Sequence, residues 1–310
     1  MERILVVTAL RLLVTGASGL VGSKVFTAAR AQGVRVFGTY HEHALNHEKL
    51  LRADLASGEE IHRVVQNTAP DVIIHSAGLT DVDQCELETQ RAFLVNATTT
   101  ALLANECRRI GSHFVYISTD YVFDGRTGNY TESSQSNPVN AYGRSKLAGE
   151  ESTLTASKTF CVARTSVVYG WGREYRANIG SWAYQELRAA RPIKIVSDQY
   201  ASPTLNSQLA RMLLEIAQKR TPGIIHVAGE TRLSRYDLVR AIASEFKLDA
   251  NLIVPIKSSS ASWTAKRPPD SSLSVHKVKQ LLDNKPLSVL EGVKTFAKEL
   301  GQTHEQGRLD

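Results

Sequence analysis

The 310-residue sequence predicts an α/β protein, with a doubly wound parallel sheet followed by a smaller C-terminal lobe. Short apolar runs rich in β-branched residues alternate with amphipathic stretches through the first half of the chain, as in repeated strand–helix units. A glycine-rich turn stands directly between the first regular strand and the first helix. The pattern becomes irregular after residue 165, so we expect residues 1–165 and 166–310 to form two units.

The composition is that of an ordinary globular protein, with 42% hydrophobic and 22% charged residues. The net charge of +6 is scattered along the chain, which favours an anionic ligand such as a nucleotide over nucleic acid. Three cysteines without metal spacing indicate reduced thiols. The apolar opening at Ile4–Leu10 is too short to span a membrane and lacks a cleavage site, so we expect a cytoplasmic protein.

The first predicted strand is Arg11–Thr15, and the helix after it runs to about Gln32 and stops at Gly33. Later strands are expected at residues 34–39, 72–75, 114–118 and 159–164, and the helices between them include an amphipathic one at 89–110. This order predicts a parallel sheet that is covered by helices on both faces.

The turn after the first strand has glycines at every third position, Gly16, Gly19 and Gly22. Gly16 permits a tight turn, Gly19 lets the backbone approach a pyrophosphate, and Gly22 lets the helix pack closely on the sheet. The spacing differs from the GxGxxG of ordinary dinucleotide-binding Rossmann folds, and plain turn chemistry is the alternative. Its place between a strand and a helix favours phosphate binding. Further cofactor contacts are expected from Ser18, Leu20 and Val21.

The second strand ends in Thr39-Tyr40-His41-Glu42-His43, with no acid at its tip for the ribose hydroxyls of NAD. Glu42 could serve from the loop, whereas His41 or His43 could contact a 2′-phosphate. We therefore favour NADPH, with NADH as the alternative. The predicted contacts at this end of the cofactor are Tyr40, His41, Asp54 and Leu55.

Small residues follow the strand at 72–75. Ser76, Ala77, Gly78 and Thr80 stand where a flat ligand can lie against the backbone, which suits the cofactor ribose.

Two groups of side chains allow a metal-site interpretation. They are the histidines at 41, 43 and 47 and the acids Asp81, Asp83 and Glu86. Exposed loop histidines and a helix start that favours acids explain both groups, so we expect no metal.

The stretch 114–146 holds the candidate catalytic groups. Its first part is an apolar strand that stops at Ser118-Thr119-Asp120, as a buried strand does when its carboxyl end opens into a cleft. Asn140 can cap a new helix on which Tyr142 and Lys146 share a face at i and i+4. A phenol beside an ammonium, near a strand-end hydroxyl, can give a proton to a carbonyl. The pair alone could equally be a tyrosine packed on a lysine stem, so its context decides.

From Arg11 to about Leu300 the sequence resembles the extended short-chain dehydrogenase/reductase family, and within it the dTDP-4-dehydrorhamnose reductase family. The motifs that carry the resemblance are the turn at 15–22, Ser118-Thr119-Asp120-Tyr121-Val122-Phe123-Asp124-Gly125, Tyr142-Gly143-Arg144-Ser145-Lys146, Arg164-Thr165-Ser166, the segment 198–204 and Arg267-Pro268-Pro269-Asp270. Each motif is weak alone, and together they are specific.

The resemblance implies that the nicotinamide supplies a hydride and that the protein supplies position and a proton. Tyr142 is the implied acid, Lys146 lowers its pKa and holds the nicotinamide ribose, and Thr119 bonds the carbonyl oxygen. The implied substrate contacts are Thr80, Asp83, Thr119, Asp120, Tyr121, Phe123, Gln199 and Arg267.

Two positions bear on which reaction occurs. Related 4,6-dehydratases carry Asp-Glu where this chain has Asp120 followed by Tyr121, which disfavours dehydration. Epimerases usually have small residues here, so Tyr121 and Phe123 also argue against them. The rhamnose reductases usually bear a Trp where this chain has Val167, which leaves the proton chemistry intact and the sugar undetermined.

The pattern of the second half predicts a substrate-binding lobe, with strands near 193–196 and 224–227 that return to the large sheet. Helices are expected at 177–190 and 205–219, another is capped by Ser234 and reaches Phe246, and residues 251–269 are loop-rich. Arg267 could pair with a diphosphate, although a solvated surface arginine is the alternative.

Two functions follow from this sequence. The first is NAD(P)H-dependent reduction of the 4-keto group of a deoxy sugar nucleotide, with dTDP-4-dehydro-L-rhamnose as the favoured substrate, by a homodimer. The second is a non-catalytic NADP-binding role, because the regulatory β subunit of methionine adenosyltransferase is similar to the same family. A related sugar-nucleotide reductase or epimerase is a further alternative to the first.

Overall fold

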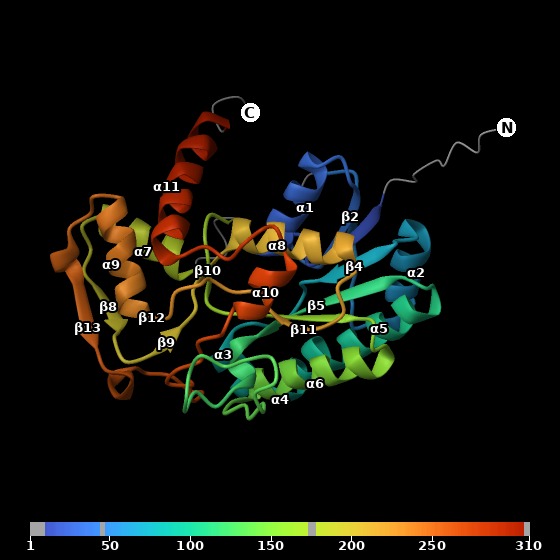
Figure 1. Cartoon of the computed structure of the whole chain (residues 1–310), viewed down its shortest axis with the longest axis horizontal. Helices are drawn as coiled ribbons and strands as arrows, with labels where there is room; N and C mark the ends of the chain where they lie inside the picture. The colour runs from blue at the N-terminus through green and yellow to red at the C-terminus, as the bar shows by residue number, and fades with distance from the viewer. Residues whose placement is uncertain (1–9, 44–46, 173–177, 307–310) are drawn as a thin grey trace.

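The computed structural model describes residues 10–43, 47–172 and 178–306, with side chains as far as residue 300. Within these residues the centre is a seven-stranded parallel sheet in the order β11-β6-β5-β4-β1-β2-β3 (Figure 1). Its strands are β1 (Arg11–Thr15), β2 (Arg35–Tyr40), β3 (Leu50–Arg52), β4 (Val72–His75), β5 (His113–Thr119), β6 (Cys161–Thr165) and β11 (Gly223–His226). The order reverses between β1 and β4, where the carboxyl ends of the strands open a crevice. The predicted doubly wound sheet is confirmed.

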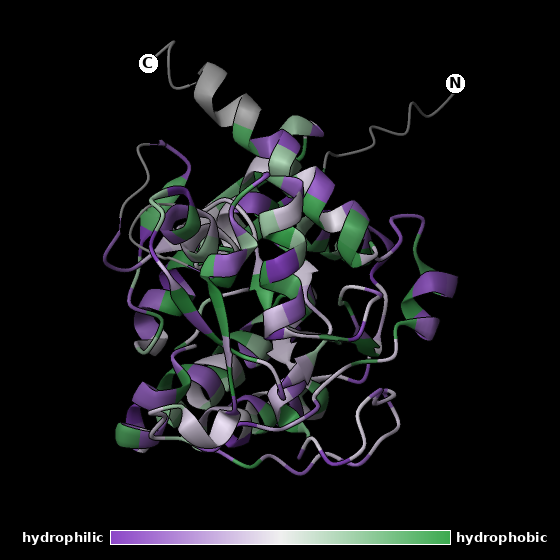
Figure 2. Ribbon diagram, turned by 90° about the vertical axis from the view of Figure 1, so that its left-hand side faces the viewer, coloured by the Kyte–Doolittle hydropathy of each residue, from purple (hydrophilic) through white to green (hydrophobic). Residues whose placement is uncertain are grey.

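Apolar side chains cover both faces of the sheet because its central strands alternate between two cores. Leu12 and Val14 of β1 belong to one hydrophobic cluster, and Leu13 belongs to the other. The first face is covered by α1 (Gly22–Ala31) and α8 (Asn206–Lys219), and the second by α2 (Gly58–Thr68), α5 (Thr99–Arg109) and α6 (Ala141–Ala156) (Figure 1). Figure 2 shows hydrophobic strand segments inside and hydrophilic loops at the periphery.

The helix predicted at 89–110 is interrupted. It consists of α4 (Thr89–Phe93), a π-helical turn (Leu94–Thr98) and α5, and it follows the short α3 (Val82–Leu87). The π-helical turn carries Asn96, whose side chain is buried and bonds both the amide and the carbonyl of Leu79 at 2.9 Å. Such turns often occur at functional sites, and this one ties the loop after β4 to the helix layer.

The C-terminal lobe packs around its own small cores. It contains α7 (Ile179–Arg188), α9 (Arg235–Glu245), α10 (His276–Leu281) and α11 (Val289–Gln306), with the strand pairs β7 (Val168–Tyr169) with β10 (Thr204–Leu205), β9 (Tyr200–Ala201) with β12 (Leu233–Ser234), and β8 (Ile193–Val196) with β13 (Ile253–Ile256). The predicted cap is present, because the Ser234 side chain accepts the Asp237 amide. Gly223–His226 lies in the large sheet beside β6.

The prediction that residues 193–196 return to the large sheet is wrong. This strand, β8, instead pairs with β13, which lies inside the segment expected to be loop-rich. The reason is its apolar side: Ile193 and Ile195 pack with Leu187 of α7 and Val239 of α9 in a separate hydrophobic cluster. The division of the chain at residue 165 stays a prediction.

None of the described helices is long and apolar enough to cross a bilayer. The apolar opening at Ile4–Leu10 falls mostly outside the described residues, which begin at residue 10.

Candidate active site

The glycine-rich turn is as tight as its spacing predicts. Gly16 has φ +64°, and a Cβ there would lie 2.8 Å from the backbone of Ala77. A Cβ on Gly22 would lie 2.2 Å from the Gly16 carbonyl oxygen and 2.6 Å from Ser76 Oγ. Strand β1, the start of α1 and the loop after β4 are therefore in contact. Val21 at the N-cap of α1 provides no side-chain hydrogen bond, so no side chain competes with a phosphate at this helix start.

The rest of the turn lies against the C-terminal lobe. Ser18, Leu20 and Val21 are half-buried. Asn206 Nδ2 donates to the carbonyl oxygens of Leu20 at 3.4 Å and of Trp171 at 2.9 Å. The start of α8 thus connects the turn to the loop after β7.

The residues predicted for the adenosine end lie at the edge formed by β2 and β3. Tyr40 is half-buried and pairs in register with Arg52, whose Nε donates to the His41 carbonyl at 3.4 Å. Asp54 is exposed and accepts the Ala56 amide at 3.0 Å. Arg52 was not predicted, because only its three-dimensional neighbours distinguish it from other surface arginines.

The possible metal ligands have separate partners. His47 packs edge-on against Phe26 at 5.3 Å, Asp81 caps α3 through the Gln84 amide, and Glu86 accepts the Ala141 amide at 2.7 Å. In the described ranges, no three side chains of these types converge as metal ligands do.

The three predicted catalytic residues lie at one edge of the sheet. Thr119 ends β5, while Tyr142 and Lys146 lie in the first turns of α6, which Asn140 caps through the Gly143 amide at 2.8 Å. Lys146 is buried, with Nζ donating to the Ile117 carbonyl at 2.7 Å and lying 4.0 Å from where a Cβ on Gly78 would be. The ammonium therefore reaches the small-residue loop after β4.

Burial shifts the pKa values of Tyr142 and Lys146 in opposite directions. It raises the pKa of Tyr142 well above its usual range, and a hydrogen bond with Thr119 opposes the shift. It lowers the pKa of Lys146 to about 7, and the charge of Glu150 opposes that shift. The net lowering of the Tyr142 pKa that was expected from Lys146 is not found, since burial of the phenol raises its pKa. Tyr142 keeps its proton at neutral pH, as an acid catalyst must.

Asp120 is buried, and its carboxylate is hydrogen-bonded to side chains of the protein. Its Oδ2 accepts the hydroxyls of Ser166 at 2.7 Å and Ser271 at 2.5 Å, and its Oδ1 accepts Thr119 Oγ1 at 3.1 Å. Burial raises the pKa of Asp120 although these bonds oppose it. The predicted substrate contact is thus corrected: protein hydroxyls occupy the carboxylate and tie β5 to the C-terminal segment. The Thr119 proton also points to Asp120, so its oxygen faces the Tyr121 amide at 3.2 Å.

Tyr121 connects the proton donor to the lobe. Its ring meets the Tyr142 ring edge-on, with centroids 5.9 Å apart. Its hydroxyl lies 3.4 Å from Gln199 Nε2 and 3.4 Å from Arg235 Nη2, and Arg235 Nε donates to Gln199 Oε1 at 2.7 Å. Sequence reasoning missed Arg235, although it directly follows the predicted helix cap at Ser234.

Phe123 is a core residue, which corrects its prediction as a substrate contact. It is fully buried, its ring stacks on Tyr130 at 4.2 Å, and the Arg164 guanidinium lies 5.0 Å from its centroid. A side chain enclosed on these sides has no face left for a ligand.

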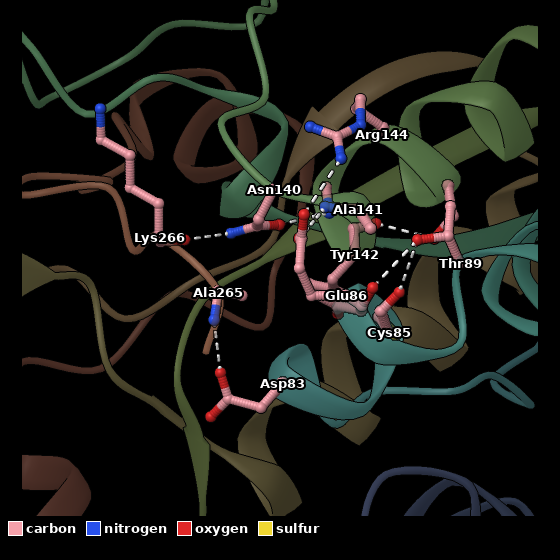
Figure 3. A network of polar contacts seen from close by, with 12 residues as sticks. Asp83, Cys85, Glu86, Thr89, Asn140, Ala141, Tyr142, Arg144, Ala265 and Lys266 are labelled. Atoms are coloured by element: carbon pink, nitrogen blue, oxygen red, sulfur yellow. Dashed lines mark hydrogen bonds and ion pairs between the residues drawn. The ribbon is translucent and has the colours of Figure 1, made fainter. Parts of the chain in front are cut away.

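Asp83 and Arg267 lie together, as an ion pair. Arg267 Nη1 and Nη2 donate to the two Asp83 oxygens at 3.0 and 2.9 Å. Asp83 also accepts the Ala265 amide at 2.8 Å, as Figure 3 shows. Thr80 is exposed in the preceding loop. The Arg267 charge, predicted for a diphosphate, is therefore at least partly neutralised by the protein.

A buried ion pair lies beneath the site. Arg164 Nη2 and Glu150 Oε2 are 2.6 Å apart, and the two side chains are 3% and 2% exposed. Ser118 donates to Glu150 Oε1 at 2.5 Å, and Arg164 also bonds Ser136. The role of this pair was not predicted, although an arginine inside the apolar run at 159–164 was a visible signal.

Val167, at the position where the resemblance led us to expect a Trp, has a strained backbone. Its φ of 35° is in the left-handed region, which costs a β-branched residue about 1–3 kcal/mol. Its neighbour Ser166 is held by Asp120, and its own carbonyl accepts the Thr204 amide at 3.2 Å. These contacts hold the turn that leads from the sheet into the lobe.

A groove of about 650 Å³ opens in the lobe beside Arg235. It lies between α7, β8, β13 and the segment 260–263, and Trp182, Trp263 and Lys194 line it with Arg235. The hydrogen bonds that the described residues make to the Arg235 guanidinium come from the neutral side chains of Gln199 and Tyr121. Two cations and two indole rings suit a ligand that is both anionic and planar.

Comparisons with known proteins point to one family. The family model described as "RmlD substrate binding domain" matches residues 10–302. The chain is 33% identical over 269 residues to the probable low-salt glycan biosynthesis reductase Agl14 of Haloferax volcanii, covering 86% of this chain and 90% of that one. It is 31% identical over 303 residues to a dTDP-4-dehydrorhamnose reductase of Aggregatibacter actinomycetemcomitans, covering 93% and 99%. It is 30% identical over 277 residues to the methionine adenosyltransferase 2 subunit beta of Danio rerio, covering 87% and 84%.

A solved structure has the same fold. The dTDP-4-dehydrorhamnose reductase of Bacillus anthracis in complex with NADP superposes with a TM-score of 0.85 at 27% identity, covering 94% of this chain and 100% of that one.

The buried ion pair generates a prediction about stability. We expect Glu150→Gln to lower the free energy of unfolding by about 3–5 kcal/mol, because it leaves the Arg164 charge buried without its partner. Urea unfolding followed by circular dichroism measures this change. Glu151→Gln, at the exposed neighbouring position, is the matched control and should change stability little. Equal effects of the two substitutions would contradict the role given to the pair.

Proposed function

The chain belongs to the RmlD substrate binding domain family, whose relatives include NAD(P)-dependent sugar-nucleotide reductases, and we propose that it reduces the 4-keto group of a deoxy sugar nucleotide. The observation that carries the proposal is the place of Tyr142. It is a phenol that keeps its proton, on a capped helix, hydrogen-bonded to Thr119 at the end of β5 and edge-on against Tyr121, whose hydroxyl lies near Arg235 of the groove. We infer dTDP-4-dehydro-L-rhamnose as the substrate, and a homodimer as the assembly.

The cofactor is inferred from a fit to the chain's own residues. The turn at Gly16 and Gly22 has no room for side chains, and no side chain caps the start of α1, which suits a pyrophosphate. Lys146 and the loop at Gly78 would hold the nicotinamide ribose, and the bound nicotinamide supplies the hydride. As charge develops on the sugar oxygen, Tyr142 transfers its proton to that oxygen. Thr119, whose hydrogen bond with Tyr142 opposes the rise of the phenol's pKa, holds the phenol beside the end of β5.

The groove supports a nucleotide diphosphate as the remote half of the substrate. Arg235 and Lys194 supply positive charge, and Trp182 and Trp263 supply flat apolar surface for a base. The contacts from Arg235 through Tyr121 to Tyr142 support a diphosphate bound next to the reacting end of the molecule.

A second candidate is a regulatory subunit without turnover, because the similarity to the methionine adenosyltransferase 2 subunit beta covers 87% of this chain. Stoichiometric association with a methionine adenosyltransferase, together with NADP binding and no reduction of any keto sugar, would favour it. The proton-donor geometry at Tyr142 favours the reductase.

The role of Tyr142 is tested by Tyr142→Phe. We expect kcat for reduction of dTDP-4-dehydro-L-rhamnose to fall about 100-fold or more, because the proton donor is lost. The Kd for NADPH should not change. Loss of absorbance of the reduced nicotinamide measures the rate, and Tyr236→Phe in α9 is the control. Full turnover by the Tyr142 variant would refute the assignment.

The preference for NADPH is tested at Arg52. Arg52→Ala removes the cation beside Tyr40 and His41, and with it one charge-assisted hydrogen bond to a 2′-phosphate. The Kd for NADPH should therefore rise about 10-fold, whereas the Kd for NADH should not change. Nicotinamide fluorescence measures both constants. Arg63→Ala, on the outer side of α2, should affect neither. A parallel loss of affinity for both cofactors would rule out recognition of the 2′-phosphate by Arg52.

The state of Lys146 predicts a pH dependence. Burial lowers its pKa from 10.5 to about 7, so the side chain is charged below that pH and loses its charge above it. If the ammonium holds the ribose, affinity for NADH should fall about 3- to 10-fold as pH rises through 7. In Lys146→Arg the side chain stays charged across this pH range, so the affinity for NADH should not change with pH. The same decline in both proteins would assign the titration to another group.

A further inference from the structure

The segment 265–273, here called the strap, leaves the rim of the groove and returns across the active-site edge. On the lobe side, the Pro268 carbonyl accepts Gln199 Nε2 at 3.3 Å and the Ser271 amide donates to the Tyr200 carbonyl at 3.0 Å. On the sheet side, Ser271 bonds Asp120. The strap therefore touches both the lobe that holds the groove and the strand end that carries Thr119.

The beginning of the strap is bound to the helices around Tyr142 (Figure 3). Asp83 of α3 accepts the Ala265 amide at 2.8 Å and pairs with Arg267. Between these two residues, the Lys266 carbonyl accepts Asn140 Nδ2 at 2.8 Å. The strap is thus joined to the N-terminus of the helix that carries the proposed proton donor.

The opposite end of the Asn140 amide has a different partner. Its Oδ1 accepts the Gly143 amide at 2.8 Å, which caps α6, and Asn140 is fully buried. Glu86 completes the start of this helix by accepting the Ala141 amide at 2.7 Å. Tyr142 lies between the two amides that these side chains hold. Its position is therefore set by Asn140 and Glu86.

A carboxamide is rigid, so its oxygen and nitrogen cannot be oriented independently. If the strap moved away, Asn140 Nδ2 would become a buried donor without an acceptor, which is unfavourable. Relieving that loss by turning the amide would take Oδ1 away from the Gly143 amide. The bond to the strap and the cap of the helix consequently favour each other.

We propose that Asn140 is a positioning residue that couples the seating of the strap to the placement of Tyr142. A sugar nucleotide that engages the groove and the strap then also stabilises the helix start that presents the phenol. This inference rests on the proposed function in taking Tyr142 as the proton donor. The coupling between the strap and the start of α6 does not depend on that role.

The two ends of the amide can be separated by substitution. Asn140→Ser keeps a good helix cap and loses the donor to Lys266, whereas Asn140→Ala loses both. We expect the serine variant to raise KM for the sugar nucleotide about 3- to 10-fold with kcat nearly unchanged. The alanine variant should show the same rise in KM and an additional fall in kcat of about 5-fold. Asn137→Ser, an exposed asparagine bonded to Asp124, is the matched control.

Hydrogen exchange followed by mass spectrometry tests the coupling without any turnover. In Asn140→Ser, amides of the strap around Ala265 should exchange faster while the amide of Gly143 stays protected. In Asn140→Ala, both regions should exchange faster. Unchanged exchange in the strap of the serine variant would overturn the proposal. Failure of the wild type to reduce a keto sugar would refute the proposed function and leave this exchange result standing.

Discussion

The buried ion pair between Glu150 and Arg164 is the interaction on which the carboxyl edge of the sheet depends. It joins helix α6 to strand β6, and Ser118 adds strand β5 through its bond to the same carboxylate. Both charges are almost completely withdrawn from water, so each is tolerated only while the other stays in place. The pair thereby fixes the strand end that bears Thr119 relative to the helix that bears Tyr142.

The other acids near the site are also engaged by the protein. Asp120 accepts three hydroxyls, Asp83 pairs with an arginine of the strap, and Glu86 accepts an amide at the start of α6. Carboxylates that already accept such bonds are poorly placed to exchange protons with a substrate. This favours the phenol of Tyr142 as the donor. It also gives a physical reason why an Asp at position 120 does not by itself make a dehydratase site.

Local sequence patterns predicted the features that depend on residues close together in the chain. The tight turn at Gly16, the cap at Asn140 and the confirmed parallel sheet follow from glycine conformation, side-chain capping and strand periodicity. The errors arose where the deciding partner is remote in sequence. Asp120 meets a serine 151 positions away, and Arg235 meets Tyr121 across 114 positions. A carboxylate held by hydroxyls and one facing a substrate have the same local sequence.

Burial acts on Tyr142 and Lys146 in opposite directions and favours the neutral form of each. It keeps the proton on the phenol, and it brings the ammonium close to losing its charge near neutral pH. Glu150 opposes the second shift, and the same carboxylate is the buried partner of Arg164. Structural integrity and the protonation state of the site consequently depend on the same carboxylate.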